Sequence, residues 1–208
     1  MKTILIAAFT PFGGETVNPA LLAAERIEKE GVGSARVTMV TLSVVKDQCW
    51  DELRSAIEAA RPDAVIVIGQ AGGRTAITPE RVAINVNDFR IPDNGGNQPT
   101  GEPVIPGGPA AYWSTLPIKA IEKAMREAGV PAEISNTAGT FVCNHIFYHL
   151  MAYAETHPEI QNAGFIHVPY LPEQAVGKPG APSMDLGTMV KGLKAGIQAV
   201  LDIKGNQD

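Results

Sequence analysis

One segment of this sequence gathers residue types that could do chemistry. GTFVCNHIFYHL, residues 139–150, holds one of the two cysteines and two of the four histidines of the chain. Apolar residues at helical spacing after Cys143 predict a helix whose first turn carries the thiol on its buried side. Unpaired N–H groups and the positive end of the helix dipole can lower the pKa of such a thiol. From this helix alone, Cys143 is either a nucleophile or a small core residue, and the core residue is the more common case.

The two histidines of this segment raise a second possibility. His145 and His149 stand four residues apart, a spacing that can hold zinc, but the glutamate of the HExxH motif is absent. Cys143 and His145 project about 200° from one another around a helix, so they cannot easily ligate one ion. We interpret the histidines as packing or surface residues and expect no metal site.

A carboxylate and a third histidine follow predicted strands elsewhere in the chain. His167 ends the apolar run GFIHV, and Glu80 lies in the loop GQAGGRTAITPER that follows the run DAVIVIG. In open α/β sheets, ligands bind outside the carboxyl ends of the strands. Cys143, His167 and Glu80 could therefore form a site in which a base takes the thiol proton and an acid orients the base.

The elements that would position these residues alternate between strand and helix. Periodicity and turn residues predict strands at 3–9, 35–44, 63–69, 131–136 and 163–168, an extended segment at 82–91, and helices at 19–30, 47–60, 121–130, 143–155 and 183–202. Buried strands separated by amphipathic helices indicate an α/β fold with a mostly parallel sheet. We expect one domain over residues 1–208.

Residues 92–109 fit neither pattern. They hold five prolines and five glycines, and a loop of this length inside a domain is usually functional or disordered. An inter-domain linker is the alternative, but the flanking segments belong to the same α/β alternation. We expect a loop packed beside a site.

Bulk properties exclude several classes of function. The formal charge of −5 argues against a sequence-independent nucleic-acid binder, and no apolar run approaches the ~20 residues of a membrane helix. The glycine-rich turns match no nucleotide-binding motif. Two cysteines are too few for a disulfide framework, and the apolar start of the chain lacks a cleavage site, so we expect a cytoplasmic protein.

Several long segments together resemble one known family. They are PFGG…NP (11–19), GQAGGR…ITPERVAIN (69–85), RIPDNGGNQP (90–99), GGPAAYWSTLPIKA (107–120), GTFVCNHIFY (139–148) and FIHVPYLPEQ (165–174). In this order they resemble the pyroglutamyl-peptidase I, or pyrrolidone-carboxylate peptidase, family of cytosolic cysteine exopeptidases. The resemblance covers nearly the whole chain. It implies a three-layer αβα fold of the phosphorylase/hydrolase-like kind, with a twisted and mostly parallel central sheet.

The resemblance also implies roles for particular residues. It makes Cys143 the nucleophile, His167 its base and then acid, and Glu80 the carboxylate that orients His167. It assigns Arg90 to supporting the thiolate or the oxyanion. It places six residues around the pyroglutamyl ring, of which Gln70 acts through its backbone: Phe9, Phe12, Gln70, Ile91, Phe141 and Val142.

The implied reaction is removal of N-terminal pyroglutamate from peptides through an acyl-enzyme on Cys143, with no metal or organic cofactor. The resemblance further implies a homo-oligomer, a tetramer in this family. Departures at Ala8, Thr10 and 43–45 leave the three catalytic residue types intact but alter positions near the pocket. The alternatives are another cysteine amidase or acyltransferase on the same frame, or a non-catalytic small-molecule binding protein. Cys49 is interpreted as structural.

Overall fold

The computed structural model describes residues 1–203 and contains one central five-stranded sheet in the order β2-β1-β3-β7-β4. The strands are β1 (Thr3–Phe9), β2 (Arg36–Leu42), β3 (Ala64–Gln70), β4 (Thr78–Pro79), β5 (Val82–Ile84), β6 (Ala111–Trp113) and β7 (Asn162–Val168). The helices are α1 (Pro19–Glu30), α2 (Gln48–Ala60), α3 (Ile118–Glu127), α4 (Val142–Thr156), α5 (Pro172–Ala175) and α6 (Leu186–Asp202). The predicted domain also includes 204–208, which lie outside the described residues.

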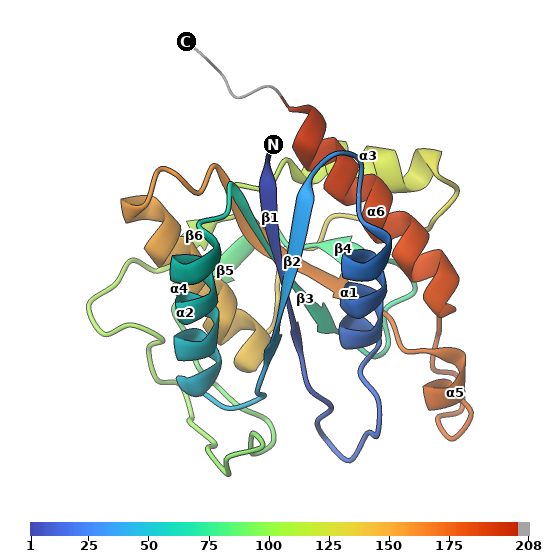
Figure 1. Cartoon of the computed structure of the whole chain (residues 1–208). Coiled ribbons are helices and arrows are strands. Elements are labelled where there is room, and N and C mark those ends of the chain that lie inside the picture. The colour runs from blue at the N-terminus through green and yellow to red at the C-terminus, as the bar shows by residue number, and fades with distance from the viewer. Residues whose placement is uncertain (204–208) are drawn as a thin grey trace.

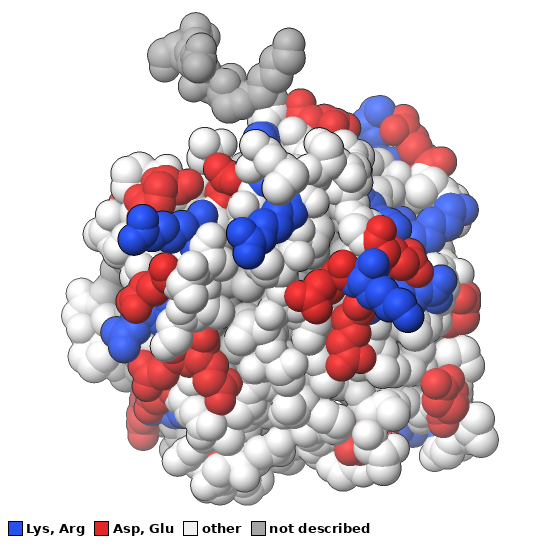
Figure 2. Space-filling view, viewed as in Figure 1, with Lys and Arg blue, Asp and Glu red and all other residues white. Residues whose placement is uncertain are grey.

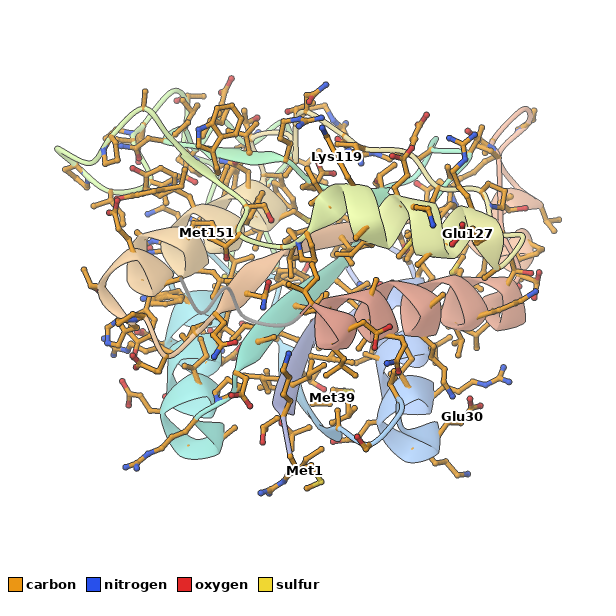
Figure 3. All side chains as sticks on the ribbon, turned by 90° about the horizontal axis from the view of Figure 1, so that it is seen from above. Met1, Glu30, Met39, Lys119, Glu127 and Met151 are labelled. Carbon is orange, nitrogen blue, oxygen red and sulfur yellow. The ribbon has the colours of Figure 1, made fainter. Side chains whose placement is uncertain are left out.

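Helices cover both faces of the sheet, which gives the three layers that the sequence predicts. Figure 1 shows α1, α3 and α6 on one side of the strands and α2 and α4 on the other. The view from above in Figure 3 separates the same layers, with Lys119 and Glu127 on α3 opposite Met151 on α4. Each face of the sheet has its own apolar core, because every residue of β3 is buried and successive side chains point to opposite faces.

Pairing within the sheet is mostly parallel, as predicted. β1 pairs in parallel with β2 and β3, and β3 pairs in parallel with β7. Only β4 runs antiparallel, at the edge beside β7. The carboxyl ends of the four parallel strands therefore meet at one edge, which is the lower end of the molecule in Figure 1.

Local signals explain where the first helix begins and ends. Asn18 caps α1 by accepting a hydrogen bond from the Ala20 N–H at 3.0 Å, and Pro19 occupies the first helical position. Gly31 ends the helix with a φ of 71°, a left-handed conformation that favours glycine.

Two sequence-based assignments need correction. Residues 131–136 are not a strand: Ala132 and Ser135 make only isolated parallel bridges, to Ile77 and Glu80. Backbone hydrogen bonds join this segment to residues 77–81, but Pro79 on the facing segment has no N–H to donate, so the ladder is interrupted between the two bridges. The extended segment predicted at 82–91 is a strand only as far as Ile84.

On the face of the molecule seen in Figure 2, charged side chains are spread out rather than gathered in one patch. In Figure 2 positive and negative residues are interspersed, and uncharged residues cover most of the lower part of this face. Within residues 1–203, none of the helices combines the length and apolar character needed to cross a bilayer.

Candidate active site

The Cys143 thiol lies at the carboxyl edge of the sheet. Cys143 is the second residue of α4, and a Cβ atom added to Gly69 at the end of β3 would lie 3.3 Å from its Sγ atom. Gly69 and His167 are register partners on β3 and β7, so their side-chain positions share one face of the sheet. The thiol therefore lies over Gly69, on the sheet face that also carries the His167 side chain.

His167 is bonded to Glu80 at this edge. Its Nδ1 atom lies 2.7 Å from the Glu80 Oε1 atom, and both side chains are buried. Because a neutral imidazole carries one proton, donation from Nδ1–H leaves the lone pair of Nε2 free to accept another. The short antiparallel strand β4 brings Glu80 here by pairing Thr78 with His167.

Arg74 completes the buried network, and sequence analysis did not single it out. Its Nη1 atom lies 2.5 Å from Glu80 Oε1 and also contacts the Thr78 hydroxyl, while Nη2 donates to the Thr137 carbonyl at 3.0 Å. The guanidinium supplies the opposite charge that a buried carboxylate needs. The Glu80 Oε2 atom has no hydrogen-bond partner within residues 1–203. Arg74 stands in the quoted GQAGGR segment, but no spacing rule connects it to Glu80.

The thiol is not the low-pKa group that the helix position suggested. Burial raises the pKa of Cys143 to about 12, and the nearby Glu80 charge adds to the increase while Arg74 opposes it. Burial also lowers the pKa of His167, against the effect of its bond to Glu80. Desolvation outweighs the helix N-terminus at this point, so near neutral pH the pair consists of a thiol and a neutral imidazole.

A small pocket opens beside the thiol. It is lined by Phe9, Phe12, Asn18, Val44, Gln70, Phe141, Val142 and Cys143. Five of the six residues that the resemblance places around the ring are in this set. Ile91 is not, and Asn18 and Val44 are additional. Asn18 was explained by helix capping alone, and Val44 belongs to a segment noted only as a departure from the family.

Within residues 1–203, no hydrogen bond or ion pair joins the Arg90 side chain to Cys143, His167 or Glu80. Arg90 is exposed, and among the described residues it takes part in no ion pair. Its neighbour Phe89 is buried, and the Phe89 ring packs edge-on against Phe141 with 4.7 Å between centroids. The assignment of Arg90 to oxyanion support stays a prediction.

The proline- and glycine-rich loop lies against the segment that carries Val44. The carboxylate of Asp93 is buried and accepts a hydrogen bond from the Lys46 N–H at 2.7 Å. The Asn94 side chain donates to the Pro11 carbonyl at 3.0 Å. These bonds hold the loop next to two segments that reach the pocket.

Within residues 1–203, the other two histidines of residues 139–150 make no hydrogen bond or ion pair with Cys143, His167 or Glu80. His145 is fully buried, and burial lowers the pKa of His145 to about 3 and that of His149 to about 4. Both imidazoles are therefore neutral near pH 7. The His145 ring is also hydrogen-bonded, to the Asn87 side chain and the Asp47 N–H.

A mostly parallel sheet between two helical layers, with a thiol, an imidazole and a carboxylate at its carboxyl edge, is typical of α/β enzymes that act through a cysteine nucleophile. The sequence matches the family model described as "Pyroglutamyl peptidase" over residues 2–203. The chain belongs to the pyroglutamyl peptidase family.

Similar proteins cover almost the same length. The pyrrolidone-carboxylate peptidase of Bacillus thuringiensis (strain Al Hakam) is 50% identical over 204 residues, covering 98% of this chain and 95% of the relative. That of Escherichia fergusonii is 52% identical over 201 residues, covering 97% and 94%. The crystal structure of pyroglutamyl peptidase I from Bacillus amyloliquefaciens superposes with a TM-score of 0.94 at 49% identity, covering 97% of this chain and 96% of that one. A mutant pyrrolidone carboxyl peptidase from Pyrococcus furiosus superposes with a TM-score of 0.92 at 41% identity, covering 96% and 98%.

Proposed function

We propose that this protein is a cysteine peptidase that hydrolyses the amide bond after an N-terminal pyroglutamyl residue and releases pyroglutamate. The arrangement of Cys143, His167 and Glu80 beside an uncharged pocket carries this proposal. Membership of the family and the names of the similar proteins support it.

The reaction begins with proton transfer inside the site. As substrate binds, His167 Nε2 takes the Cys143 proton while Glu80 stabilises the imidazolium through Nδ1–H. The thiolate attacks the carbonyl carbon of the amide bond that joins pyroglutamate to the next residue, and a tetrahedral intermediate forms. His167 then protonates the departing amine, and its neutral form next activates the water that hydrolyses the thioester. Pyroglutamate leaves, and the thiol is restored.

The first turn of α4 provides donors for the oxyanion. Backbone N–H groups in the first turn of a helix have no intrahelical acceptor, and the Cys143 N–H is one of them. An N–H held next to the nucleophile can bind the charge that develops on the attacked oxygen. We assign the main oxyanion contact to this N–H and a supporting role to Arg90.

The end of β3 has a free backbone donor and acceptor suited to a lactam. Pairing between β1 and β3 ends at Ala8 and Ile68, so the edge of β3 beyond this pair is open. The Ala71 N–H donates to the Val168 carbonyl on β7. In a parallel sheet the N–H and C=O groups of successive residues point to alternate sides, so those of Gln70 point toward the open edge.

The side chain of Gln70 is held elsewhere, which leaves its backbone groups for the ligand. Its Oε1 atom accepts a hydrogen bond from Gln174 at 3.0 Å. The rings of Phe12 and Phe141 lie 6.0 Å apart between centroids and form apolar walls for a flat ring. A neutral lactam needs this combination of apolar walls with one donor and one acceptor.

Hydrolysis of a chromogenic pyroglutamyl amide tests the proposal. We expect cleavage by the purified protein, loss of cleavage with iodoacetamide and in Cys143→Ser, and no loss with EDTA. The matched control is Cys49→Ala, which removes the other, fully buried thiol and keeps activity. A prolyl amide should be a poor substrate, because proline lacks the lactam carbonyl that the Gln70 N–H would bind.

Two results would contradict the proposal. If folded protein leaves the pyroglutamyl amide intact but hydrolyses another small amide, the chain is a different cysteine amidase. If it binds pyroglutamate and cleaves nothing, the chain is a binding protein on the same frame.

We further propose a cytoplasmic location, a single domain and a homo-oligomeric assembly for this enzyme. Both cysteines are free, as expected for a cytoplasmic protein. We treat residues 1–208 as one domain, since both cores pack on the same sheet. Family resemblance suggests a homo-oligomer. The Trp113 side chain on β6 is 69% exposed, and a second copy of the chain could cover it. Light scattering coupled to size exclusion tests the assembly, and a monomer at micromolar concentration would contradict it.

A further inference from the structure

Two histidines and an aspartate cluster where α2 begins beside α4, on the same sheet face as Cys143. His145 and His149 lie one turn apart on α4, and Asp47 directly precedes α2. One ligand atom from each of the three side chains lies within 4.8 Å of those of the other two. Figure 1 shows how α2 and α4, far apart in the sequence, run side by side.

His145 is oriented in the way that metal ligands usually are. Its Nδ1 atom lies 3.1 Å from Asn87 Oδ1, and its Nε2 atom accepts a hydrogen bond from the Asp47 N–H at 3.2 Å. The ring proton is therefore on Nδ1, and the Nε2 lone pair points to Asp47, whose Oδ1 atom is 3.5 Å away. In metal sites the ligating histidine typically donates its other N–H to an oxygen that fixes the tautomer and the ring orientation.

His149 has a buried nitrogen that the fold does not satisfy. Its Nε2 atom is inaccessible to solvent and has no hydrogen-bond partner within the described part of the chain. The Trp50 indole stacks on the imidazole, with 5.4 Å between centroids and 15° between planes, and so holds the ring in place. A buried polar atom without a partner needs an explanation, and an ion is one.

We propose that Asp47, His145 and His149 form a binding site for a transition-metal dication of the zinc class, separate from the Cys143 site and outside the reaction. Two imidazole nitrogens and one carboxylate oxygen suit zinc, with water in the fourth position. The Asp47 side chain is 68% exposed, so the site is open to solvent on that side. On binding, the ion would replace the Asp47 N–H as the partner of the His145 Nε2 lone pair. It would also replace Lys46, whose Nζ atom lies 3.1 Å from Asp47 Oδ2, as the partner of the Asp47 carboxylate.

The site joins two segments that reach the substrate pocket. Val44 and Cys143 both line the pocket, and they stand three residues before Asp47 and two residues before His145. An ion held by Asp47 and His145 would connect these segments. The simpler account of the cluster, a hydrogen-bonded anchor without an ion, leaves the His149 nitrogen unexplained.

Cobalt titration tests the site without depending on activity. The parent protein is Cys143→Ser, stripped with a chelator, so that the active-site thiol cannot bind the probe. We expect a single equivalent of Co²⁺ to bind with visible absorption of the tetrahedral type and no thiolate charge-transfer band, and Zn²⁺ to displace it. Asp47→Asn and His149→Gln should each weaken binding by at least about tenfold, the smallest loss usual even for outer-shell partners of a metal site.

The control is His157→Gln, which changes the residue that follows α4 and lies outside the cluster. It should bind cobalt as the parent does. Circular dichroism shows whether each variant is folded. If His149→Gln is not folded, Asp47→Asn still tests the site, because it changes an exposed side chain. An unchanged Co²⁺ affinity in Asp47→Asn would overturn the proposal. A loss of affinity in His157→Gln as large as that in Asp47→Asn would also overturn it, and so would a thiolate charge-transfer band, which would place the cobalt on Cys49.

Discussion

The Cys143 thiol lies where two opposing effects on its pKa meet. The helix N-terminus favours the thiolate, whereas burial and the Glu80 carboxylate favour the thiol, and burial is the largest effect. His167, with its pKa lowered by burial, is neutral and free to act as a base. The resting site therefore resembles a serine protease dyad more than a preformed thiolate–imidazolium pair.

This protonation state predicts how alkylation of Cys143 depends on pH. Because the pKa of the thiol is raised to about 12, the thiolate population and the iodoacetamide inactivation rate should keep rising through the alkaline range. Inactivation followed from pH 6 to 10, with residual activity as the readout, measures this. A rate that levels off below pH 8 would mean that a preformed thiolate exists in the free enzyme.

Glu80 should contribute mainly to the catalytic step. Glu80→Gln keeps the shape of the side chain but replaces the carboxylate that faces His167 Nδ1 and Arg74. We expect kcat to fall by roughly two to four orders of magnitude, as for other carboxylates that orient a catalytic histidine, with a smaller change in KM. Steady-state kinetics on the pyroglutamyl amide measure the split, and the exposed Glu133→Gln serves as the control. If kcat falls equally in the two variants, Glu80 does not orient the catalytic histidine.

At the scale of elements, the site depends on how closely α4 approaches the end of β3. A Cβ atom at Gly69 would lie 2.6 Å from the Phe165 ring as well as 3.3 Å from Cys143 Sγ. Phe165 is fully buried and packs against the His167 ring with 4.6 Å between centroids. Only glycine at position 69 leaves room for the thiol and this ring together.

Gly69→Ala should therefore damage both activity and stability. The added methyl group must displace Phe165 or Cys143, and overpacking of this kind costs about 1–3 kcal/mol. We expect a lower melting temperature and a loss in kcat/KM, measured by thermal unfolding and by amide hydrolysis. Gly177→Ala is the matched control, because a Cβ atom there meets open space. If Gly69→Ala behaves like Gly177→Ala, the close approach of α4 is not required.

The predicted elements were largely correct, and the errors have local causes. The runs 3–9, 19–30 and 63–69 match β1, α1 and β3 within one residue, because caps and buried apolar runs are encoded by neighbouring residues. The strand predicted at 131–136 was wrong because pairing there depends on a distant segment, in which Pro79 has no N–H and leaves two isolated bridges.

At the scale of the whole molecule, buried neutral histidines make stability sensitive to acid. His145 and His149 have folded pKa values of about 3 and 4, below the ordinary value of 6.5. Between these values the unfolded chain binds protons that the folded protein excludes, so the free energy of unfolding falls as pH decreases. Each such group contributes about 1.4 kcal/mol per pH unit.

Chemical denaturation from pH 4 to 6, with EDTA present to keep metal away, measures this effect. We expect stability to decrease steadily toward pH 4, and His149→Gln to reduce the slope by at most about 1.4 kcal/mol per pH unit, since glutamine does not titrate. An unchanged slope in this variant would show that His149 is protonated in the folded state.

The sequence alone determined the strand and helix alternation, the parallel sheet and three catalytic candidates, Cys143, His167 and Glu80. These depend on periodicity, on caps and on residues at the ends of predicted elements, together with a family resemblance that covers nearly the whole chain. Only the tertiary structure decided that Arg74 meets Glu80, that Asp47 lies beside His145, and that burial raises the pKa of Cys143. Such contacts join segments through β-sheet register and helix packing, and desolvation depends on everything packed around a group, so no local pattern contains them.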